Sequence, residues 1–474
     1  MPRQPVYSIP ANVANTQMLH FYPDPEKKEE EGLPKTVRSY AGYADVNIQD
    51  IPESHLFYWF FESQTCDPNI DADKQKELIE QTPLLIWLNG GPGASSLAGL
   101  FLENGPLRIG DDAAGSISVS PDTWNQEAHV LYWDQPIGSG YSYYDGDDQD
   151  DKGYVKDEET LSQMFWLALQ QFFATYPEYL KCPLYVCGES YAGKYVPYIA
   201  KKIHEQNRGN TGTHLNLAGI AVGNGWIRPE LSIRVMIDYA YASGFLGLGQ
   251  KDVLDFGYAN FQEALRAGKL KKATDLGNGL VNAVLAFGGN FYLYDVRSWD
   301  GLSVGALPAY LNSDAVKASL HVDHEWQFAD NSGPVADALK ADIMADASPV
   351  YTDLIDAPEK YKVLLYTGDF DSACGYQSTE EILDEIMKDG WRNAERLIWK
   401  QAQGHPKGFV RTLKNVTQVA VPDSGHEVPA YQPQVSREML YNWLFDRPFH
   451  GQDPTSAVQA ILDKAQQDAD QEKE

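Results

Sequence analysis

The sequence predicts an α/β protein in which a mostly parallel central sheet is flanked by helices. Short, continuous apolar runs such as those at 84–88 and 217–222 are typical of strands that a parallel sheet buries on both faces. Residues 158–176 carry apolar side chains three and four positions apart, which is the spacing of an amphipathic helix. Because strands and helices alternate along the chain, the strands are expected to lie parallel.

The elements of this sheet are predicted in chain order from the same patterns. Alternating side chains at 43–48 and an apolar run at 56–61 predict an opening hairpin. The helix at 158–176 and a second helix at 192–204 are expected to cover the sheet. Further strands are predicted at 84–88, 130–133, 183–187, 217–222, 363–366 and 416–421.

The strand pattern is lost between residues 226 and 357, where aromatic-rich helical segments take its place. We therefore interpret 226–357 as a mainly helical cap that is inserted into the core and folded over the sheet. The core is then formed by 1–225 and 358–474. Within it, the Pro- and Glu-rich residues 1–35 are expected to form an N-terminal arm, and the tail from Ser456 is expected to form an acidic amphipathic helix.

Composition argues against several classes of partner. The chain has 474 residues and a formal net charge of −29, which would repel nucleic acid and anionic membranes, so neither is expected to bind. No stretch approaches the roughly 20 apolar residues of a membrane span. The four cysteines are too few and too scattered for a disulfide framework or a metal cluster, so no metal or cofactor is expected.

Ser190 is the candidate nucleophile. It falls on the turn between the strand at 183–187 and the helix at 192–204, and Gly188 and Gly193 flank it. Small residues around a serine permit a tight, strained turn that exposes the hydroxyl and leaves the next backbone N–H free to bind an oxyanion. Taken alone, the pattern fits an ordinary surface turn about equally well.

Three other loops follow predicted strands and carry matching chemistry. Residues 89–93, Asn-Gly-Gly-Pro-Gly, offer backbone N–H groups at the carboxyl end of a strand, where α/β sheets bind ligands. An acidic loop at 368–374 and a histidine loop at 424–429 follow late strands. The order of serine, acid and histidine is characteristic of the α/β-hydrolase fold, and it favours catalysis over a chance serine.

Seven motifs form a distinctive series along the chain: WLNGGPG at 87–93, DQPIGSGYSY at 134–143, GESYAG at 188–193, GNG at 223–225, YDVR at 294–297, GDFD at 368–371 and GHEVP at 425–429. This series resembles that of the serine carboxypeptidases, and in particular of their carboxypeptidase Y-like members. The resemblance extends from about Tyr40 to Leu444 and implies an α/β-hydrolase fold with an inserted cap.

The resemblance implies an enzyme that releases C-terminal amino acids from peptides or proteins through an acyl-enzyme. Ser190 would be the nucleophile and His426 the general base. Asp371, in preference to Asp369, would orient His426. The oxyanion hole would be formed by the backbone N–H groups of Gly91 and Tyr191.

The same resemblance implies a binding site for the end of the substrate chain. The terminal carboxylate would be held by Asn89, Gly90, Glu103 and Glu189. A carboxylate does not comfortably meet two ionised glutamates, so at least one of Glu103 and Glu189 should carry a proton when substrate binds. Peptidase activity is therefore expected to be best in acid. Glu427, beside His426, would favour a basic leaving residue.

The chain also departs from the family pattern. Ala94 stands where many relatives have a disulfide cysteine, so a cystine-braced cap is not expected. Relatives are usually secreted or vacuolar, but sparse cysteines and an N-terminus without a signal peptide fit a reducing, cytoplasmic setting equally well. Cellular location, oligomeric state, any propeptide and side-chain preference are left open by the sequence.

Two other functions use the same residues. An acyltransferase or another specialised hydrolase would pass the acyl group to an alcohol or amine instead of water. The presence of Asn89, Glu103 and Glu189, which bind a free carboxylate in the family, favours peptides. A non-catalytic binding protein is the other alternative, and the intact set of Ser190, Asp371 and His426 argues against it.

Overall fold

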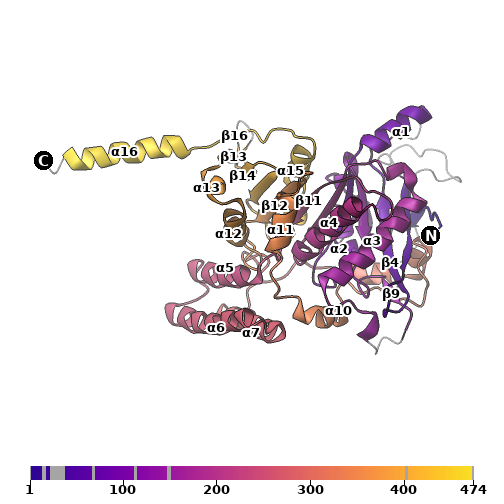
Figure 1. The fold of residues 1–474 in the computed structure, drawn as a ribbon, viewed down its shortest axis with the longest axis horizontal. Helices are drawn as coiled ribbons and strands as arrows, with labels where there is room; N and C mark the ends of the chain where they lie inside the picture. The colour runs from indigo at the N-terminus through magenta and orange to yellow at the C-terminus, as the bar shows by residue number, and fades with distance from the viewer. Residues whose placement is uncertain are drawn as a thin grey trace.

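One large sheet runs through the molecule (Figure 1). The structure is a computed structural model, and it describes residues 2–12, 18–21, 38–66, 70–110, 115–146, 151–400 and 404–471. Among these residues, twelve strands form the sheet in the order β16-β13-β14-β15-β12-β11-β10-β5-β8-β4-β3, and β9 also pairs with β4. The strands are β3 (Ser39–Val46), β4 (Ser54–Phe61), β5 (Leu84–Leu88), β8 (His129–Trp133), β9 (Tyr143–Tyr144), β10 (Leu184–Glu189), β11 (Leu217–Gly223), β12 (Lys362–Gly368), β13 (Arg396–Trp399), β14 (Gly408–Leu413), β15 (Val416–Val421) and β16 (Gly451–Gln452).

The six central strands, from β8 to β15 in the sheet order, are parallel, and antiparallel strands flank them on both sides. The predicted α/β class with a parallel centre is confirmed. Parallel register brings the carboxyl ends of β5, β10, β11, β12 and β15 to one edge of the sheet. The loops with the candidate site residues begin at this edge.

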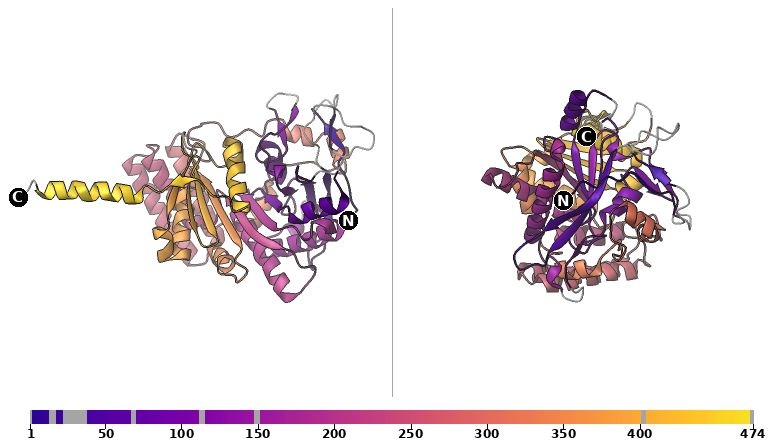
Figure 2. Two further views of the ribbon diagram at one scale, coloured as in Figure 1. Left: turned by 90° about the horizontal axis from the view of Figure 1, so that it is seen from above. Right: turned by 90° about the vertical axis from the view of Figure 1, so that its right-hand side faces the viewer.

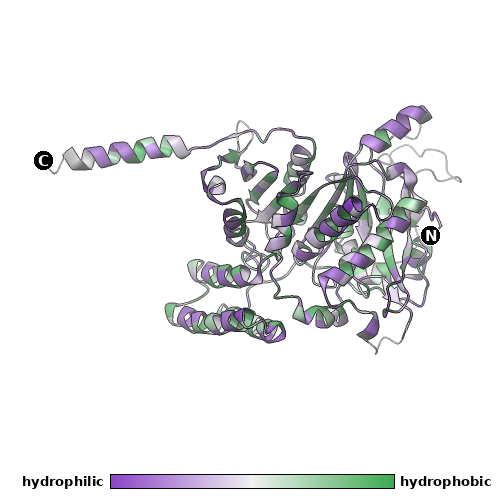
Figure 3. Cartoon of the chain, viewed as in Figure 1, coloured by the Kyte–Doolittle hydropathy of each residue, from purple (hydrophilic) through white to green (hydrophobic). Residues whose placement is uncertain are grey.

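Both faces of the sheet are covered, which explains the continuous apolar runs. In β5, Ile86 and Leu88 point into one buried cluster and Leu85 and Trp87 into the other. Figure 3 shows the apolar strands between more polar helices. One cluster includes side chains of α3 (Glu158–Thr175), α4 (Ala192–Gly209), α11 (Ser348–Ile355) and α12 (Tyr376–Met387). The other includes side chains of α2 (Ser96–Leu102), α8 (Leu307–Leu311), α9 (Asp314–Ser319) and α15 (Pro433–Leu444).

Residues 226–357, all of which the structure describes, contain helices α5–α11 and no strand longer than an isolated bridge. Helices α5 (Pro229–Ala242), α6 (Leu248–Arg266) and α7 (Leu270–Phe287) pack into a third buried cluster. Cys374, from the loop after β12, belongs to this cluster. The helices therefore contact the sheet at the edge where the candidate residues lie. The division into a core and an inserted cap stays a prediction.

The antiparallel edge formed by β13, β14 and β16 was not predicted. Most residues of β13 and β14 are partly exposed, so their sequences contain no continuous apolar run. Their place in the sheet depends on pairing with β15 and on a β16 strand of two residues. Neither feature produces a local pattern that sequence reasoning detects.

The remaining elements lie around this sheet. Two small antiparallel pairs are β1 (Ser8–Pro10) with β2 (Met18–His20), and β6 (Leu107–Ile109) with β7 (Ile117–Val119). The other helices are α1 (Ala72–Gln81), α10 (Gly333–Ala338), α13 (Asp389–Asn393), α14 (Val428–Tyr431) and α16 (Thr455–Gln471), with 3-10 turns η1 (Trp124–Gln126), η2 (Asp151–Gly153), η3 (Pro177–Tyr179) and η4 (Leu339–Ala341).

The two ends of the chain behave differently. Val6 and Ile9 are buried, so the described part of 1–35 packs against the protein; the rest of the predicted arm lies outside the described residues. Helix α16 extends away from the body (Figure 2) and exposes Val458, Ile461 and Leu462. Within the described ranges, we find no helix with the length and apolar character needed to cross a membrane. All four cysteines are buried and unpaired.

Candidate active site

Ser190 stands on the predicted strand-turn-helix junction, between β10 and α4. Its φ of 62° is rare for a residue other than glycine, and such strain persists only where the surroundings hold the backbone in place. The Ser190 N–H donates to the Gly223 carbonyl at 3.0 Å. The Ser190 carbonyl accepts from the N–H groups of Gly193 and Trp226, both at 2.8 Å. The neighbouring strand β11 and its loop thus fix the turn.

The glycine loop after β5 packs directly against this turn. A Cβ atom at Gly90 would lie 2.3 Å from the backbone nitrogen of Tyr191, so only glycine fits there. Gly91 has a φ of 104°, a conformation that side chains rarely adopt. The structure therefore brings the two predicted oxyanion donors, at Gly91 and Tyr191, into neighbouring backbone segments.

Asp134 holds the far end of this loop. Its carboxylate accepts hydrogen bonds from the Ser95 hydroxyl at 2.6 Å and from the Ser96 N–H at 3.0 Å, where α2 begins. It also accepts from the Tyr141 N–H at 3.0 Å. The motif at 134–143 therefore supports the loop from the end of β8.

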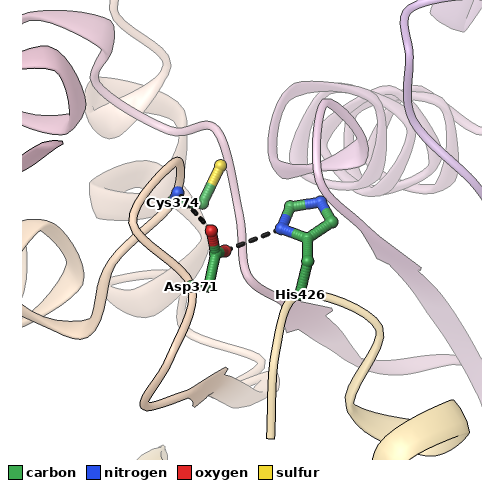
Figure 4. Close-up of side chains that lie close together, drawn as sticks. All are labelled: Asp371, Cys374 and His426. Atoms are coloured by element: carbon green, nitrogen blue, oxygen red, sulfur yellow. Dashed lines mark hydrogen bonds and ion pairs between the residues drawn. The ribbon is translucent and has the colours of Figure 1, made fainter. Parts of the chain in front are cut away.

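Asp371 lies after β12 and is 1% exposed. Its Oδ2 accepts hydrogen bonds from Nδ1 of His426 and Nδ2 of Asn224, both at 2.7 Å. Its Oδ1 accepts from the backbone N–H groups of Ala373 and Cys374, at 2.7 and 3.2 Å. The structure thus places Asp371, the preferred acid of its loop, against His426 (Figure 4).

His426 follows β15, and Asp371 holds its ring at Nδ1. With Nδ1 donating to Asp371, the lone pair of Nε2 is free. Nε2 is buried and has no hydrogen-bond partner among the described residues. Burial lowers the pKa of His426, but the Asp371 carboxylate raises it, and the net shift is upward. The imidazole can therefore accept a proton from a group in the cavity.

Three of the described residues bring possible metal ligands within 4.8 Å of one another: Asp371, Cys374 and His426. Both oxygens of Asp371 already accept two hydrogen bonds each. Burial raises the pKa of the Cys374 thiol well above its ordinary value, so the thiol keeps its proton. This arrangement orients an imidazole and is a poor fit for a cation.

The side chains predicted to bind the substrate carboxylate are hydrogen-bonded to one another. Nδ2 of Asn89 donates to Oε1 of Glu103 at 2.9 Å and to Oε1 of Glu189 at 3.1 Å. Asn89 is itself oriented by Nε1 of Trp87, which donates to its Oδ1 at 2.8 Å. Oε2 of each glutamate is buried and has no hydrogen-bond partner among the described residues. Two carboxyl groups therefore face the cavity with unused hydrogen-bonding capacity.

Burial raises the pKa of both glutamates. For Glu189 the rise is large, and the nearby negative charge of Glu103 adds to it. The pKa of Glu103 is also raised, chiefly by burial. Glu427 lies close by, and burial raises its pKa to about 7. We therefore expect the pair of Glu103 and Glu189 to share at least one proton near neutral pH.

Several of these groups line one cavity of about 230 Å³. Ser190 and His426 line it together with the carboxyl pair. Its charged lining residues are three glutamates, Asp330 and His426, so among the described residues no lysine or arginine lines it. The full lining is Asn89, Gly90, Gly91, Ala94, Ala98, Leu102, Glu103, Glu189, Ser190, Tyr294, Leu302, Val304, Asp330, Asn331, His426 and Glu427.

Two residues of the site had no predicted role. Asn224 is buried; its amide donates to Asp371, and its Oδ1 accepts from the Gly368 N–H at 3.1 Å. Tyr294 accepts a hydrogen bond from the His426 N–H at its carbonyl, at 2.8 Å, and its ring lies 4.6 Å from the imidazole. Both residues lie in motifs of the sequence, but the contacts cross long stretches of chain.

Comparisons with known proteins point to one family. The family described as "Serine carboxypeptidase" matches residues 27–286 and 289–446. The chain is similar to a probable serine carboxypeptidase CPVL of Dictyostelium discoideum, with 32% identity over 87% of this chain and 79% of that protein. It is also similar to the vitellogenic carboxypeptidase of Aedes aegypti, with 30% identity over 85% of this chain and 83% of that protein.

A solved structure shows the same fold. Kex1(delta)p, a prohormone-processing carboxypeptidase from Saccharomyces cerevisiae, superposes with a TM-score of 0.74. The two chains are 23% identical, and the match covers 86% of this chain and 92% of the other.

Proposed function

The chain belongs to the serine carboxypeptidase family and is a peptidase, and we propose that it removes C-terminal amino acids through an acyl-enzyme on Ser190. One observation carries the proposal. Ser190, the free Nε2 of His426 and the carboxyl pair of Glu103 and Glu189 line the same cavity. A peptide whose last carboxylate met the pair would extend its final peptide bond toward Ser190.

In the proposed reaction, the Ser190 hydroxyl attacks the carbonyl carbon of the last peptide bond while Nε2 of His426 takes the hydroxyl proton. The resulting oxyanion accepts hydrogen bonds from the N–H groups of Gly91 and Tyr191. The C–N bond then breaks, and His426 donates its proton to the departing amine. Water, deprotonated by His426, hydrolyses the ester and restores Ser190.

Asp371 serves this cycle by orienting His426. Its four hydrogen bonds hold the carboxylate in place, and the carboxylate keeps His426 in the tautomer with Nδ1 protonated. The same charge stabilises the imidazolium that forms when Nε2 takes the proton. Asn224 fixes the carboxylate from the opposite side.

Chain-end recognition rests on the unused oxygens of the glutamate pair. A protonated Glu103 or Glu189 donates a hydrogen bond to the substrate carboxylate, whereas two ionised glutamates repel it. Because burial raises both pKa values, the binding form is retained toward neutral pH and is lost as pH rises further. At low pH the limit is His426, which must be neutral to act as the base. Together these requirements predict a bell-shaped profile of kcat/KM, with an acid limb set by His426, whose pKa is raised, and an alkaline limb set by ionisation of the glutamate pair.

The test uses blocked dipeptides in two matched forms, one with a free terminal carboxylate and one with a terminal amide. We expect mass spectrometry to detect loss of the last residue from the free acid, and Ser190→Ala to abolish it. Addition of an amine or alcohol separates hydrolysis from acyl transfer. Equal cleavage of both forms, or hydrolysis by Ser190→Ala, would overturn the proposal.

A further inference from the structure

A buried charged cluster lies behind the nucleophile turn, outside the cavity. It consists of Lys194, Asp342, Glu158 and the hydroxyl of Tyr191. The side chain of Lys194 is only 1% exposed, and its Nζ donates to both the carbonyl and Oδ2 of Asp342. The Tyr191 hydroxyl donates to the same Oδ2 at 3.1 Å. One carboxylate therefore joins two residues that directly follow the turn of Ser190.

Within the cluster, Lys194 forms its ion pair with Asp342. Glu158, the first residue of α3, is 1% exposed and lies in the same cluster, close to Tyr191 and Lys194. Burial raises the pKa of Glu158 to about 8, so this carboxyl is mostly neutral at lower pH. The Lys194 side chain pairs with the Asp342 carboxylate. Burial of a lysine without such a partner would be costly.

Asp342 belongs to the mainly helical region 226–357, and it is one of several contacts from a short segment there. The Ile343 carbonyl accepts from Nε1 of Trp226 at 2.9 Å, and the Tyr351 hydroxyl donates to the Gly193 carbonyl at 2.8 Å. Trp226 and Gly193 both donate backbone hydrogen bonds to Ser190. Residues 342–351 therefore contact both the nucleophile turn and the residues that donate hydrogen bonds to Ser190.

We propose that Asp342 and Lys194 are positioning residues that fix the backbone of Tyr191, so that its N–H points at the oxyanion formed during catalysis. This inference rests on the proposed function. The hydroxyl of Tyr191 is held by Asp342 on one side, and its backbone follows the strained Ser190 on the other. An oxyanion donor acts only when it is already in place, because reorientation during the reaction would cost the stabilisation it supplies.

The cluster also explains why the helical region matters for chemistry that occurs in the core. The carboxylate that orients Tyr191 comes from 226–357, whereas Lys194 and Tyr191 come from the core beside α4. Formation of this ion pair therefore couples correct packing of the helical region to the geometry of the oxyanion hole.

The experiment compares three variants of the cluster with a matched control pair. Tyr191→Phe removes only the hydroxyl, Asp342→Asn removes the charge, and Lys194→Met removes the ammonium. The control is Lys201→Met with Asp353→Asn, which breaks an exposed ion pair of 2.8 Å between the same helix α4 and α11. Each protein is assayed for kcat and KM with a free-acid dipeptide and for binding of a peptidyl phosphonate, whose tetrahedral oxyanion mimics the transition state.

We expect kcat to fall about tenfold in Tyr191→Phe and up to about a hundredfold in Lys194→Met, with KM within about twofold of wild type. Affinity for the phosphonate should fall by the same factor as kcat, while affinity for the product amino acid is unchanged. The control pair should retain wild-type kcat. Near-ultraviolet circular dichroism identifies any variant that fails to fold, and Tyr191→Phe alone then decides the question.

The proposal is wrong if folded Tyr191→Phe keeps wild-type kcat, if KM rises while kcat stays constant, or if the control loses as much activity as the cluster variants. Failure of the proposed function is recognised separately. In that case Ser190→Ala still releases the C-terminal residue, whatever the cluster variants do.

Discussion

Behind the His426 imidazole the Asp371 carboxylate accepts four hydrogen bonds from described residues, whereas in the cavity Glu103 and Glu189 each accept one, from the same Asn89 amide. All three side chains are at most 3% exposed. Burial is therefore the same, and the number of donors differs. Both oxygens of Asp371 accept hydrogen bonds, while each glutamate keeps one oxygen without a donor among the described residues.

This difference teaches what each carboxyl group can do. A fully hydrogen-bonded carboxylate is a fixed negative charge, suited to orient an imidazole through many reaction cycles. The glutamate pair accepts few hydrogen bonds, so it can hold a proton and still bind another group. A substrate carboxylate can accept the hydrogen bond that a protonated glutamate donates. The following changes break or sharpen this contrast, from the largest expected effect to the smallest.

Removal of the fixed charge should have the largest effect. Asp371→Asn is expected to lower kcat by about 10⁴-fold, because an amide favours the wrong tautomer of His426. Asp369→Asn, two residues earlier in the same loop, serves as the control and should remain close to wild type. Steady-state kinetics with a blocked dipeptide measure both. Comparable losses in the two variants would contradict the assignment of Asp371.

Removal of one donor to the fixed charge should have a smaller effect. Asn224→Ala leaves Asp371 with one hydrogen bond fewer and is expected to lower kcat by about tenfold to a hundredfold. Asn216→Ala is the matched control, since Asn216 is exposed and precedes the same strand, β11, that Asn224 follows. A wild-type kcat in Asn224→Ala would show that the remaining donors suffice.

Glu189→Gln changes the glutamate pair, which we expect to share a proton. The glutamine amide donates a hydrogen bond at every pH, so the loss of activity at high pH should become weaker than in wild type. We expect the fall in kcat/KM on the alkaline side of the optimum to become severalfold smaller than in wild type. A pH profile that superposes on that of the wild type would count against a shared proton.

Glu427→Gln should have the smallest effect. Glu427 lines the cavity, and above its pKa of about 7, where it is ionised, we expect it to favour substrates that end in lysine or arginine by about twofold to fivefold. Substitution should remove this preference and leave cleavage of peptides with apolar last residues unchanged. Competition between two labelled peptides, one ending in lysine and one in leucine, measures the ratio directly.

Much of the fold followed from the sequence because its signals are local. The apolar run of β5 and the turn at Ser190 each lie within about ten residues of chain. The order of serine, acid and histidine then placed three loops at one sheet edge, since parallel strands end together.

The rest depends on contacts between distant positions. Asn224 and Asp371 are 147 residues apart, and Lys194 and Asp342 are 148 apart, so no periodicity or spacing links them. The number of donors to each carboxyl group, which distinguishes Asp371 from the glutamate pair, is likewise visible only once the chain is folded. Sequence reasoning identified the carboxyl groups but not the difference between them.

The central claim is that the glutamate pair binds the substrate's terminal carboxylate only while it holds a proton. The direct test is the ratio of kcat/KM for a free-acid dipeptide to that for its C-terminal amide, measured in the wild-type enzyme from about pH 5 to about pH 8. The account predicts a ratio well above one in acid that falls steeply as the pair ionises. A ratio that stays constant across this range would contradict it.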